Sequence, residues 1–285
     1  RRRTLMKILV VCQHYWPEPF NTSDVCEELV KRGHKVSVIT GLPNTGMPNS
    51  DIPEDYQGKN KRVEMHNGVT VYRANLYPRK TGALNRVRNY ISFWHNANQL
   101  ARSLNEEFDG VLGYQFSPVM QVDPGLVYAR KHQKKMLLYC FDLWPVSLTA
   151  GGFSETSLPY KWMAAVSKRI YRQADRIAVT SPLFDEYFSN SLGINRESSA
   201  YLPQYADDAF SSCAKCSCEG YDSSKINLTF AGNVGQAQSV ITIVEAASIA
   251  QNNQDLVFHI VGSGSRLEQC KSRASELGLN NIVFH

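Results

Sequence analysis

A glycine-bearing turn between a strand pattern and a helix pattern is the stretch best suited to bind an anion. Residues 227–231 form a short, β-rich run that we expect to be buried, and Gly232-Asn233-Val234-Gly235 follows as a sharp loop. From Ser239 the apolar residues recur at helical spacing. A helix start offers free N–H groups and a positive dipole end, and glycine lets a phosphate approach the backbone. An unliganded strand-to-helix turn has the same pattern, because neither GxGxxG nor GxxxxGK[ST] is present, so both interpretations stay open.

Two other loops place polar side chains at predicted strand ends. The apolar run 7–12 (KILVVC) is typical of a parallel strand covered on both faces, and the polar and aromatic loop 13–21 follows it. Asp142 follows a second such run, 135–141. Open α/β sheets bind ligands beyond the carboxyl ends of their strands, so we expect the chemistry to lie at these loops.

The elements that position these loops alternate between strands and helices. Asn67-Gly68 between two β-prone runs predicts a hairpin, and Thr22 or Ser23 is the expected cap of the first helix, which Gly33 ends. The alternation predicts a doubly wound parallel sheet with one hairpin. The predicted strands are 7–12, 35–40, 62–65, 69–73, 110–114, 135–141, 176–180 and 200–202, and the helices are 22–31, 79–104, 119–132 and 161–174, with another starting at 181–182.

A second, shorter series of the same kind follows a polar segment. We therefore predict a first domain over 1–206, a linker over 207–224 and a second domain over 225–285. The second domain should hold strands 227–231, 255–261 and 281–284 and helices 239–251 and 265–277. Three strands are a thin core for a free-standing sheet, so we expect this domain to be cut short here.

Composition and charge exclude several classes of protein. Among the 285 residues, no apolar run reaches the ~18 residues of a membrane span, and 43% hydrophobic content is ordinary for a globular protein. Residues 1–204 hold 26 Lys and Arg against 18 Asp and Glu, whereas 205–285 hold 5 against 8. The basic half should face an anionic partner. The basic residues match no nucleic-acid-binding motif, so we expect no nucleic acid partner.

The seven cysteines are odd in number and scattered, which favours a reduced cytoplasmic protein over a disulfide scaffold. Cys213, Cys216 and Cys218 lie close enough in sequence to suit a metal. They lack the second half of a zinc motif, so a polar loop with incidental cysteines is the better interpretation.

The helix predicted over 79–104 combines basic residues with aromatic ones. Its start could rest on an anionic lipid surface. Packing of its aromatic residues in the core, with solvated arginines, is the favoured alternative for Tyr90, Phe93 and Trp94.

Taken together, the motifs resemble those of the family 4 glycosyltransferases, which have the GT-B fold. The resemblance is closest to the N-acetyl-L-fucosamine transferase branch of O-antigen and capsule synthesis. It spans the whole chain but does not specify the sugar. The segments that carry it are KILVVCQHYWPEPFN (7–21), LPNTGMP (42–48), NGVTVYR (67–73), FDLWPVSL (141–148), DRIAVTSPLF (175–184), LPQYADD (202–208), LTFAGNVGQAQ (228–238) and FHIVGSGS (258–265).

The resemblance implies two Rossmann-like α/β domains facing across a cleft, the first binding an acceptor and the second a nucleotide-sugar. It also implies transfer with retention at the anomeric carbon, without a metal or other cofactor. The donor diphosphate would bind at residues 232–235, helped by the helix that follows. The residues implied in donor binding are Gly232, Asn233, Gly235, Gln238, Gly262, Gly264 and Gln204, the last touching the base or the sugar.

For catalysis, the resemblance directs attention to Asp142, Glu18 and His14. Asp142 would hold a hydroxyl or act as a base, and a helix N-cap carboxylate is its alternative. Glu18 and His14 would face the same cleft, although His14 serves equally well as a hydrogen-bonded loop residue.

Three departures from the family pattern bear on activity. The first loop reads Pro-Glu-Pro-Phe-Asn (17–21) where many members have a Gly-Gly pair, as it does in the branch named above. Asn233, Gln236 and Gln238 stand where many members carry an Arg and a Lys that neutralise the diphosphate. Backbone N–H groups must then do more, or a basic residue must come from the part of the second domain expected beyond His285. The family's paired glutamates fall beyond His285, so we expect the 285-residue chain to be a weak or inactive transferase.

The function expected is therefore a retaining transfer from a UDP- or GDP-sugar to a lipid-linked saccharide, in the synthesis of bacterial surface polysaccharide. Such an enzyme would be cytoplasmic and peripherally bound to the inner face of the membrane. A nucleotide-sugar epimerase of the same fold and a non-catalytic fragment are the alternatives.

Overall fold

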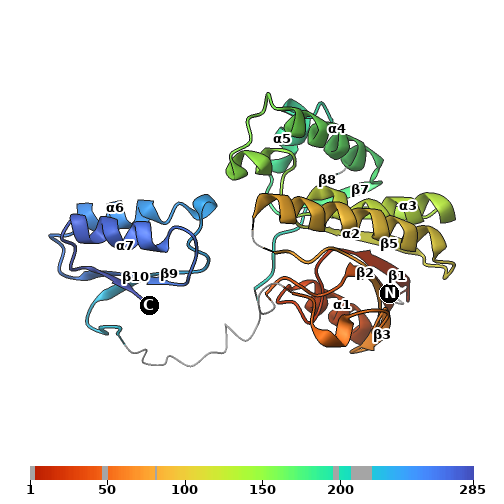
Figure 1. The fold of residues 1–285 in the computed structure, drawn as a ribbon, viewed down its shortest axis with the longest axis horizontal. Coiled ribbons are helices and arrows are strands. Elements are labelled where there is room, and N and C mark those ends of the chain that lie inside the picture. Colours follow the sequence, from red (N-terminus) through yellow and green to blue (C-terminus); the bar gives the residue numbers. More distant parts are fainter. Residues whose placement is uncertain (1–3, 47–50, 81, 195–198, 207–219) are drawn as a thin grey trace. The chain divides into compact units, whose positions relative to one another are not determined.

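The computed structural model describes residues 4–46, 51–80, 82–194, 199–206 and 220–285, and the chain divides into two compact units, 1–204 and 205–285 (Figure 1). Each unit is built on its own β-sheet with helices packed against it. Most of the predicted linker, and with it the Cys213, Cys216 and Cys218 cluster, lies outside the described residues.

The sheet of the first unit has eight strands in the order β3-β4-β2-β1-β5-β6-β7-β8. All neighbours are parallel except β3 and β4, which form the predicted hairpin around Asn67 (φ +46°) and Gly68 (φ +82°). The order reverses between β1 and β5, the kind of position where doubly wound sheets bind ligands. The strands are β1 Lys7–Val11, β2 Lys35–Gly41, β3 Val63–His66, β4 Val69–Ala74, β5 Gly110–Gln115, β6 Lys135–Cys140, β7 Arg176–Val179 and β8 Ser199–Tyr201.

The helices of the first unit lie close to their predicted positions, with corrections at their starts. Neither Thr22 nor Ser23 caps the first helix: Asn21 holds the cap position without a side-chain bond, and the Ser23 hydroxyl donates to the Phe20 carbonyl. The helix predicted from 119 begins with a 3-10 turn. The α-helices are α1 Thr22–Lys31, α2 Ala83–Ser103, α3 Asp123–His132, α4 Leu158–Gln173 and α5 Phe184–Asn190, and the short 3-10 helices are Glu54–Tyr56, Val119–Val122 and Val146–Gly151.

Two cores lie on opposite faces of this sheet. The larger packs α2, α3, α4 and α5 against one face, and the smaller packs α1 against the other. Phe93 is fully buried in the larger core, with Tyr90 and Trp94 packed against it, so the core interpretation of the α2 aromatics is confirmed. No helix in the described part of the chain is both long and apolar enough to cross a bilayer.

The second unit has a parallel three-stranded sheet in the order β11-β10-β9. Its strands are β9 Ile226–Ala231, β10 Leu256–Val261 and β11 Ile282–Phe284, and its helices are a 3-10 turn at Gln236–Gln238, α6 Ile241–Ile249 and α7 Leu267–Glu276. The two α-helices pack together over the sheet around Val244 and Ile260 (Figure 1). The expectation that 227–231 is buried is wrong, because β9 is an edge strand of this sheet and Leu228 is 43% exposed.

Candidate active site

The loop that leaves β1, residues 13–21, is closed by the carboxylate of Glu18. One oxygen, Oε1, accepts the backbone N–H groups of Asn44 (2.8 Å) and Thr45 (2.6 Å). The other, Oε2, lies 3.0 Å from Nδ1 of His14, whose ring stacks on Phe20 at 4.5 Å. Glu18 is 4% exposed and His14 is 2% exposed. Both oxygens of Glu18 are therefore engaged in joining the loops after β1 and β2.

A buried guanidinium holds the same loop from its other side. Arg73 of β4 donates to the carbonyl oxygens of Trp16 (2.6 Å) and Gly41 (3.1 Å). It also pairs with Glu64 at 2.6 Å, and its side chain is fully buried. The Trp16 ring stacks on His66 of the hairpin at 3.8 Å. Sequence reasoning missed Arg73, since a lone arginine in a strand gives no signal of its partners.

Buried side-chain amides form a hydrogen-bond network behind this loop. Gln13 Nε2 donates to Asn89 Oδ1 (2.6 Å), and Asn89 Nδ2 donates to Asn44 Oδ1 (3.2 Å). The backbone N–H of Gln13 donates to Gln121 Oε1 at 2.9 Å. All four side chains are essentially buried, so the network fixes the 13–21 loop in one conformation. Burial raises the pKa of Cys12, at the end of β1, to about 12, so this thiol stays protonated and is no nucleophile.

Asp142 lies just beyond β6, within reach of the loop that leaves β5. Its Oδ2 accepts the hydroxyl of Ser117 (2.6 Å), and Ser117 Oγ in turn accepts the indole N–H of Trp144 (3.0 Å). The carboxylate caps no helix, because Pro145 holds the cap position of the 3-10 helix that follows. The capping alternative for Asp142 is therefore wrong, and a half-buried, oriented carboxylate stands at the carboxyl edge of the sheet.

Gln204 follows β8 and is exposed. The two residues before it, Leu202 and Pro203, are tied to the sheet because their carbonyls accept from the hydroxyl of Tyr139 (3.1 and 3.2 Å). Its predicted contact with a nucleotide stays a prediction.

The loop that leaves β9, residues 232–240, has a mixture of used and open N–H groups. Those of Gly232 and Val234 donate to the carbonyls of Val261 and Ser263, both at 2.9 Å. Those of Asn233 and Gly235 find no acceptor among the described residues. The Asn233 side chain donates to Gln238 Oε1 at 3.0 Å. Alternate N–H groups of this loop are therefore bonded to the β10 exit segment, and those of Asn233 and Gly235 are not.

Gly262 and Gly264 are needed for packing between two loops. A Cβ on Gly262 would collide with the carbonyl of Gly232, and one on Gly264 would meet the backbone of Val234. The space beside these glycines is therefore filled by the β9 exit loop. This packing does not test the predicted contact of Gly262 and Gly264 with a nucleotide, which stays a prediction.

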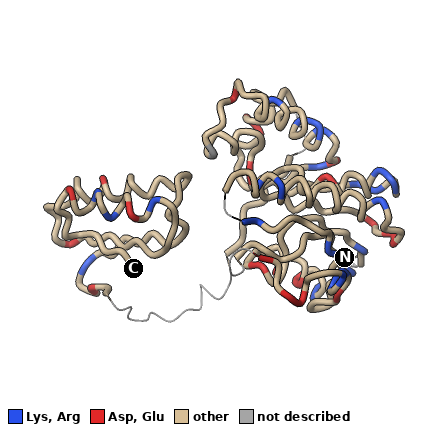
Figure 2. Tube along the Cα trace, viewed as in Figure 1, with Lys and Arg blue, Asp and Glu red and all other residues tan. Residues whose placement is uncertain are grey.

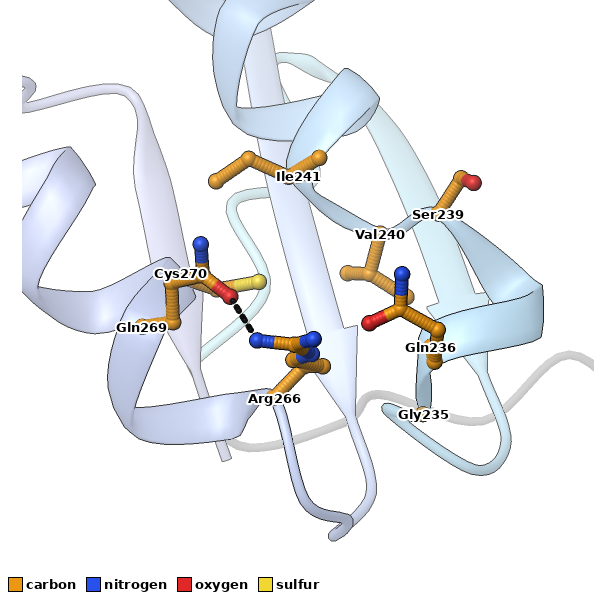
Figure 3. Close-up of a pocket in the computed structure, with 8 residues that line it drawn as sticks. All are labelled: Gly235, Gln236, Ser239, Val240, Ile241, Arg266, Gln269 and Cys270. Carbon is orange, nitrogen blue, oxygen red and sulfur yellow. Dashed lines mark hydrogen bonds between the residues drawn. The ribbon is translucent and has the colours of Figure 1, made fainter. Parts of the chain in front are cut away.

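A pocket of about 170 Å³ opens beside the β9 exit loop, where α6 and α7 begin (Figure 3). Arg266 and Gln269 line it from α7 and the residue before it, and Gly235, Gln236 and Ser239 line it from the loop. The described residues bring no three His, Cys, Asp or Glu side chains together as a metal site.

Comparison with known proteins identifies the family. The glycosyl transferase 4-like domain matches residues 21–204, more than half of the chain. The chain belongs to this glycosyltransferase family. It is 25% identical to WcaI of Escherichia coli (strain K12), a glycosyl transferase named for colanic acid biosynthesis, over 98% of the chain and 71% of that protein.

Solved structures of GT-B glycosyltransferases share the fold, which confirms the α/β fold class predicted from the sequence. The trehalose-6-phosphate protein of E. coli bound with UDP-2-fluoro glucose matches with a TM-score of 0.64 at 9% identity, over 98% of this chain and 73% of that one. Anabaena HepE, in complex with UDP and glucose, matches with a TM-score of 0.56 at 13% identity, over 98% and 68%.

Proposed function

We propose that this glycosyltransferase moves a sugar, with retention, from a UDP- or GDP-sugar to a lipid-linked saccharide during synthesis of bacterial surface polysaccharide such as O-antigen or capsule. The name of the E. coli relative supports the pathway, and the UDP bound to both structural relatives supports the donor class. The N-acetyl-L-fucosamine branch is the one we favour. The observation that carries the proposal is the β9 exit loop, where Gly235 lines a pocket and the N–H groups of Asn233 and Gly235 find no acceptor among the described residues.

The chemistry follows from where charge develops. As the glycosidic bond breaks, negative charge builds on the diphosphate, and N–H groups fixed at a helix start stabilise that charge without reorganising. Asp142, oriented by Ser117, would accept a hydrogen bond from the acceptor or sugar hydroxyl. Glu18 and His14 would shape this site by fixing two loops, since their polar atoms already bond to each other and to the backbone. No metal or other cofactor enters this scheme.

Transfer can be tested with a panel of UDP- and GDP-sugars and a polyprenyl-diphosphate-linked saccharide, with products identified by mass spectrometry. We expect sugar to appear on the lipid-linked acceptor with one donor class, and only slowly, since the 285-residue chain should be a weak transferase. Asp142→Asn should lower the rate by at least about 100-fold and leave nucleotide binding unchanged. A product formed from the donor alone would contradict transfer and favour an epimerase.

We also propose that the start of α2 and α4 rests on the anionic inner face of the cytoplasmic membrane, which makes the protein cytoplasmic and peripheral. Neither helix contains Asp or Glu, whereas both carry basic residues (Figure 2). On α2, Leu84 (65% exposed), Val87 (45%) and Ile91 (45%) stand on one face at helical spacing. On α4, Leu158 (80%) and Trp162 (47%) are exposed one turn apart. Exposed apolar residues on helices that carry basic residues suit an anionic bilayer surface.

Vesicle binding tests this surface. Arg86 and Arg88 are exposed on α2, and removal of both charges by Arg86→Gln with Arg88→Gln should weaken binding to anionic vesicles in low salt by roughly 30-fold, at about 1 kcal/mol per charge. Lys35→Gln with Lys135→Gln is the matched control, because these exposed lysines begin strands β2 and β6 at the opposite edge of the sheet. Equal binding by the two double variants would contradict the membrane proposal.

A further inference from the structure

Arg266 is hydrogen-bonded to the β9 exit loop, although it lies more than 30 positions after Val234 in the chain. Its backbone N–H donates to the carbonyl of Val234 at 2.9 Å. It occupies the N-cap position of α7, so its side chain leaves the backbone at the mouth of the pocket. Figure 3 shows its guanidinium and the Gln236 amide on opposite sides of that pocket.

The charge of Arg266 is unopposed within the described part of the chain. Its side-chain hydrogen bond goes to the neutral amide of Gln269, at 3.1 Å. The next two basic residues of α7 are paired: Lys271 lies 3.4 Å from Glu268, and Arg273 lies 2.8 Å from Glu245. A guanidinium left without a carboxylate, in a second unit that is acidic as a whole, is available to an anionic ligand.

The pocket is large enough for more than a bridging water. A water molecule needs only about 10–15 Å³ of such space, against the 170 Å³ found here. Its wall also includes Val240 and Ile241, where α6 begins and its dipole is positive. A cation, a helix start and Gly235, whose N–H finds no acceptor among the described residues, thus line one pocket.

We propose that Arg266 binds the diphosphate of the nucleotide donor and supplies the positive charge that the β9 exit loop lacks at Asn233, Gln236 and Gln238. This proposal rests on the proposed function and adds a residue to it. A planar guanidinium binds two phosphate oxygens at once, which a single backbone N–H group cannot do. When the Arg266 guanidinium leaves the Gln269 amide and bonds to a phosphate, a charged acceptor replaces a neutral one. Binding of the ligand is therefore favoured over the internal hydrogen bond.

The test compares ligands with and without phosphates by isothermal titration calorimetry on the full 285-residue chain. UDP, GDP, inorganic pyrophosphate and uridine are titrated into the wild type, Arg266→Gln and Lys271→Gln. Arg266→Gln should weaken pyrophosphate and the preferred nucleotide by about 10- to 100-fold, the range for loss of charged hydrogen bonds. Uridine should bind Arg266→Gln with the same affinity as wild type. Lys271→Gln, which removes an exposed charge from the same helix, should change each affinity less than twofold. Arg266→Lys should recover part of the loss.

The possible outcomes distinguish a failure of the role proposed for Arg266 from a failure of the proposed glycosyltransferase function. Equal diphosphate affinity in wild type and Arg266→Gln would overturn the role of Arg266 and leave donor binding intact. Loss of uridine binding together with the nucleotide would assign Arg266 to folding and also overturn it. A wild type that binds no nucleotide and no pyrophosphate would contradict the proposed function itself.

Discussion

The β1 exit loop and the β9 exit loop each follow the first strand of their unit, yet their polar groups are used in opposite ways. At the β1 exit loop, the charged groups of Glu18 and of Arg73 on β4 are buried and bonded to backbone groups of the protein. At the β9 exit loop, the N–H groups of Asn233 and Gly235 and the nearby guanidinium of Arg266 bond to no carboxylate of the described residues.

Under the proposed function, this difference corresponds to a division of labour between the two units. A loop whose carboxylate and guanidinium are already satisfied is a preformed wall, which can position an acceptor but has little charge left to bind one. A loop with open donors binds an anion and is completed by it. The reactive carboxylate of the first unit is therefore better sought at Asp142, which is half-buried and has one oxygen directed by Ser117.

The largest expected effect comes from breaking the closed loop at Glu18. Glu18→Ala removes the acceptor of two backbone N–H groups and should cost the first unit about 2–4 kcal/mol. Urea unfolding followed by circular dichroism measures it. Glu28→Gln on α1, where the carboxylate is half-exposed beside Arg32, is the control and should leave the midpoint unchanged. Full stability with lost transfer would instead make Glu18 a catalytic group.

A smaller effect is expected from separating the two loops of the second unit. Gly264→Ala places a methyl group against the backbone of Val234, so the β9 exit loop must shift, at a cost of about 1–3 kcal/mol. The temperature of thermal unfolding and the affinity for nucleotide should both fall. Ser263→Ala, one residue earlier, keeps the backbone N–H and carbonyl and should retain both. Unchanged affinity in Gly264→Ala would show that the loop need not be held by β10 to bind its ligand.

The smallest effect concerns pH and separates the second unit from the first. Burial, and then the neighbouring His285, lower the pKa of His259, which hydrogen-bonds Asn227 and stacks on Tyr221. The unfolded chain, with a histidine pKa near 6.5, takes up a proton that the folded unit resists. Stability of the second unit should therefore be full above about pH 6.5 and fall as the pH drops below it. Thermal unfolding between pH 7.5 and 5 should show this slope in wild type and a flatter one in His259→Asn; identical slopes would exclude His259 as its source.

Local patterns were sufficient to predict most of the elements. Apolar runs predicted β1 and β6, and Asn67-Gly68 predicted the hairpin, because each signal lies within a few consecutive residues. The buried state of β9 was predicted wrongly, since its edge position depends on how strands pair.

The site was less predictable because its contacts join distant residues. Glu18 meets Asn44, 26 positions away, and Arg73 meets Trp16, 57 positions away. The sequence showed that the family's two positive charges are missing near 232–238 and left their replacement open, and only the fold brings Arg266 to Val234. Gly262 and Gly264 were predicted to let a nucleotide approach, which stays a prediction, and the close approach that the structure shows at them is made by the backbone of Gly232 and Val234.

Hydrogen–deuterium exchange tests the contrast between the two loops in one experiment. Uptake is measured by mass spectrometry with and without saturating UDP or GDP. We predict that peptides covering 13–21 exchange slowly in both states, and that nucleotide slows exchange in peptides covering 232–241. Protection that appears at 13–21 instead, or an unchanged rate at 232–241 with nucleotide bound, would contradict the assignment of the β9 exit loop as the diphosphate site.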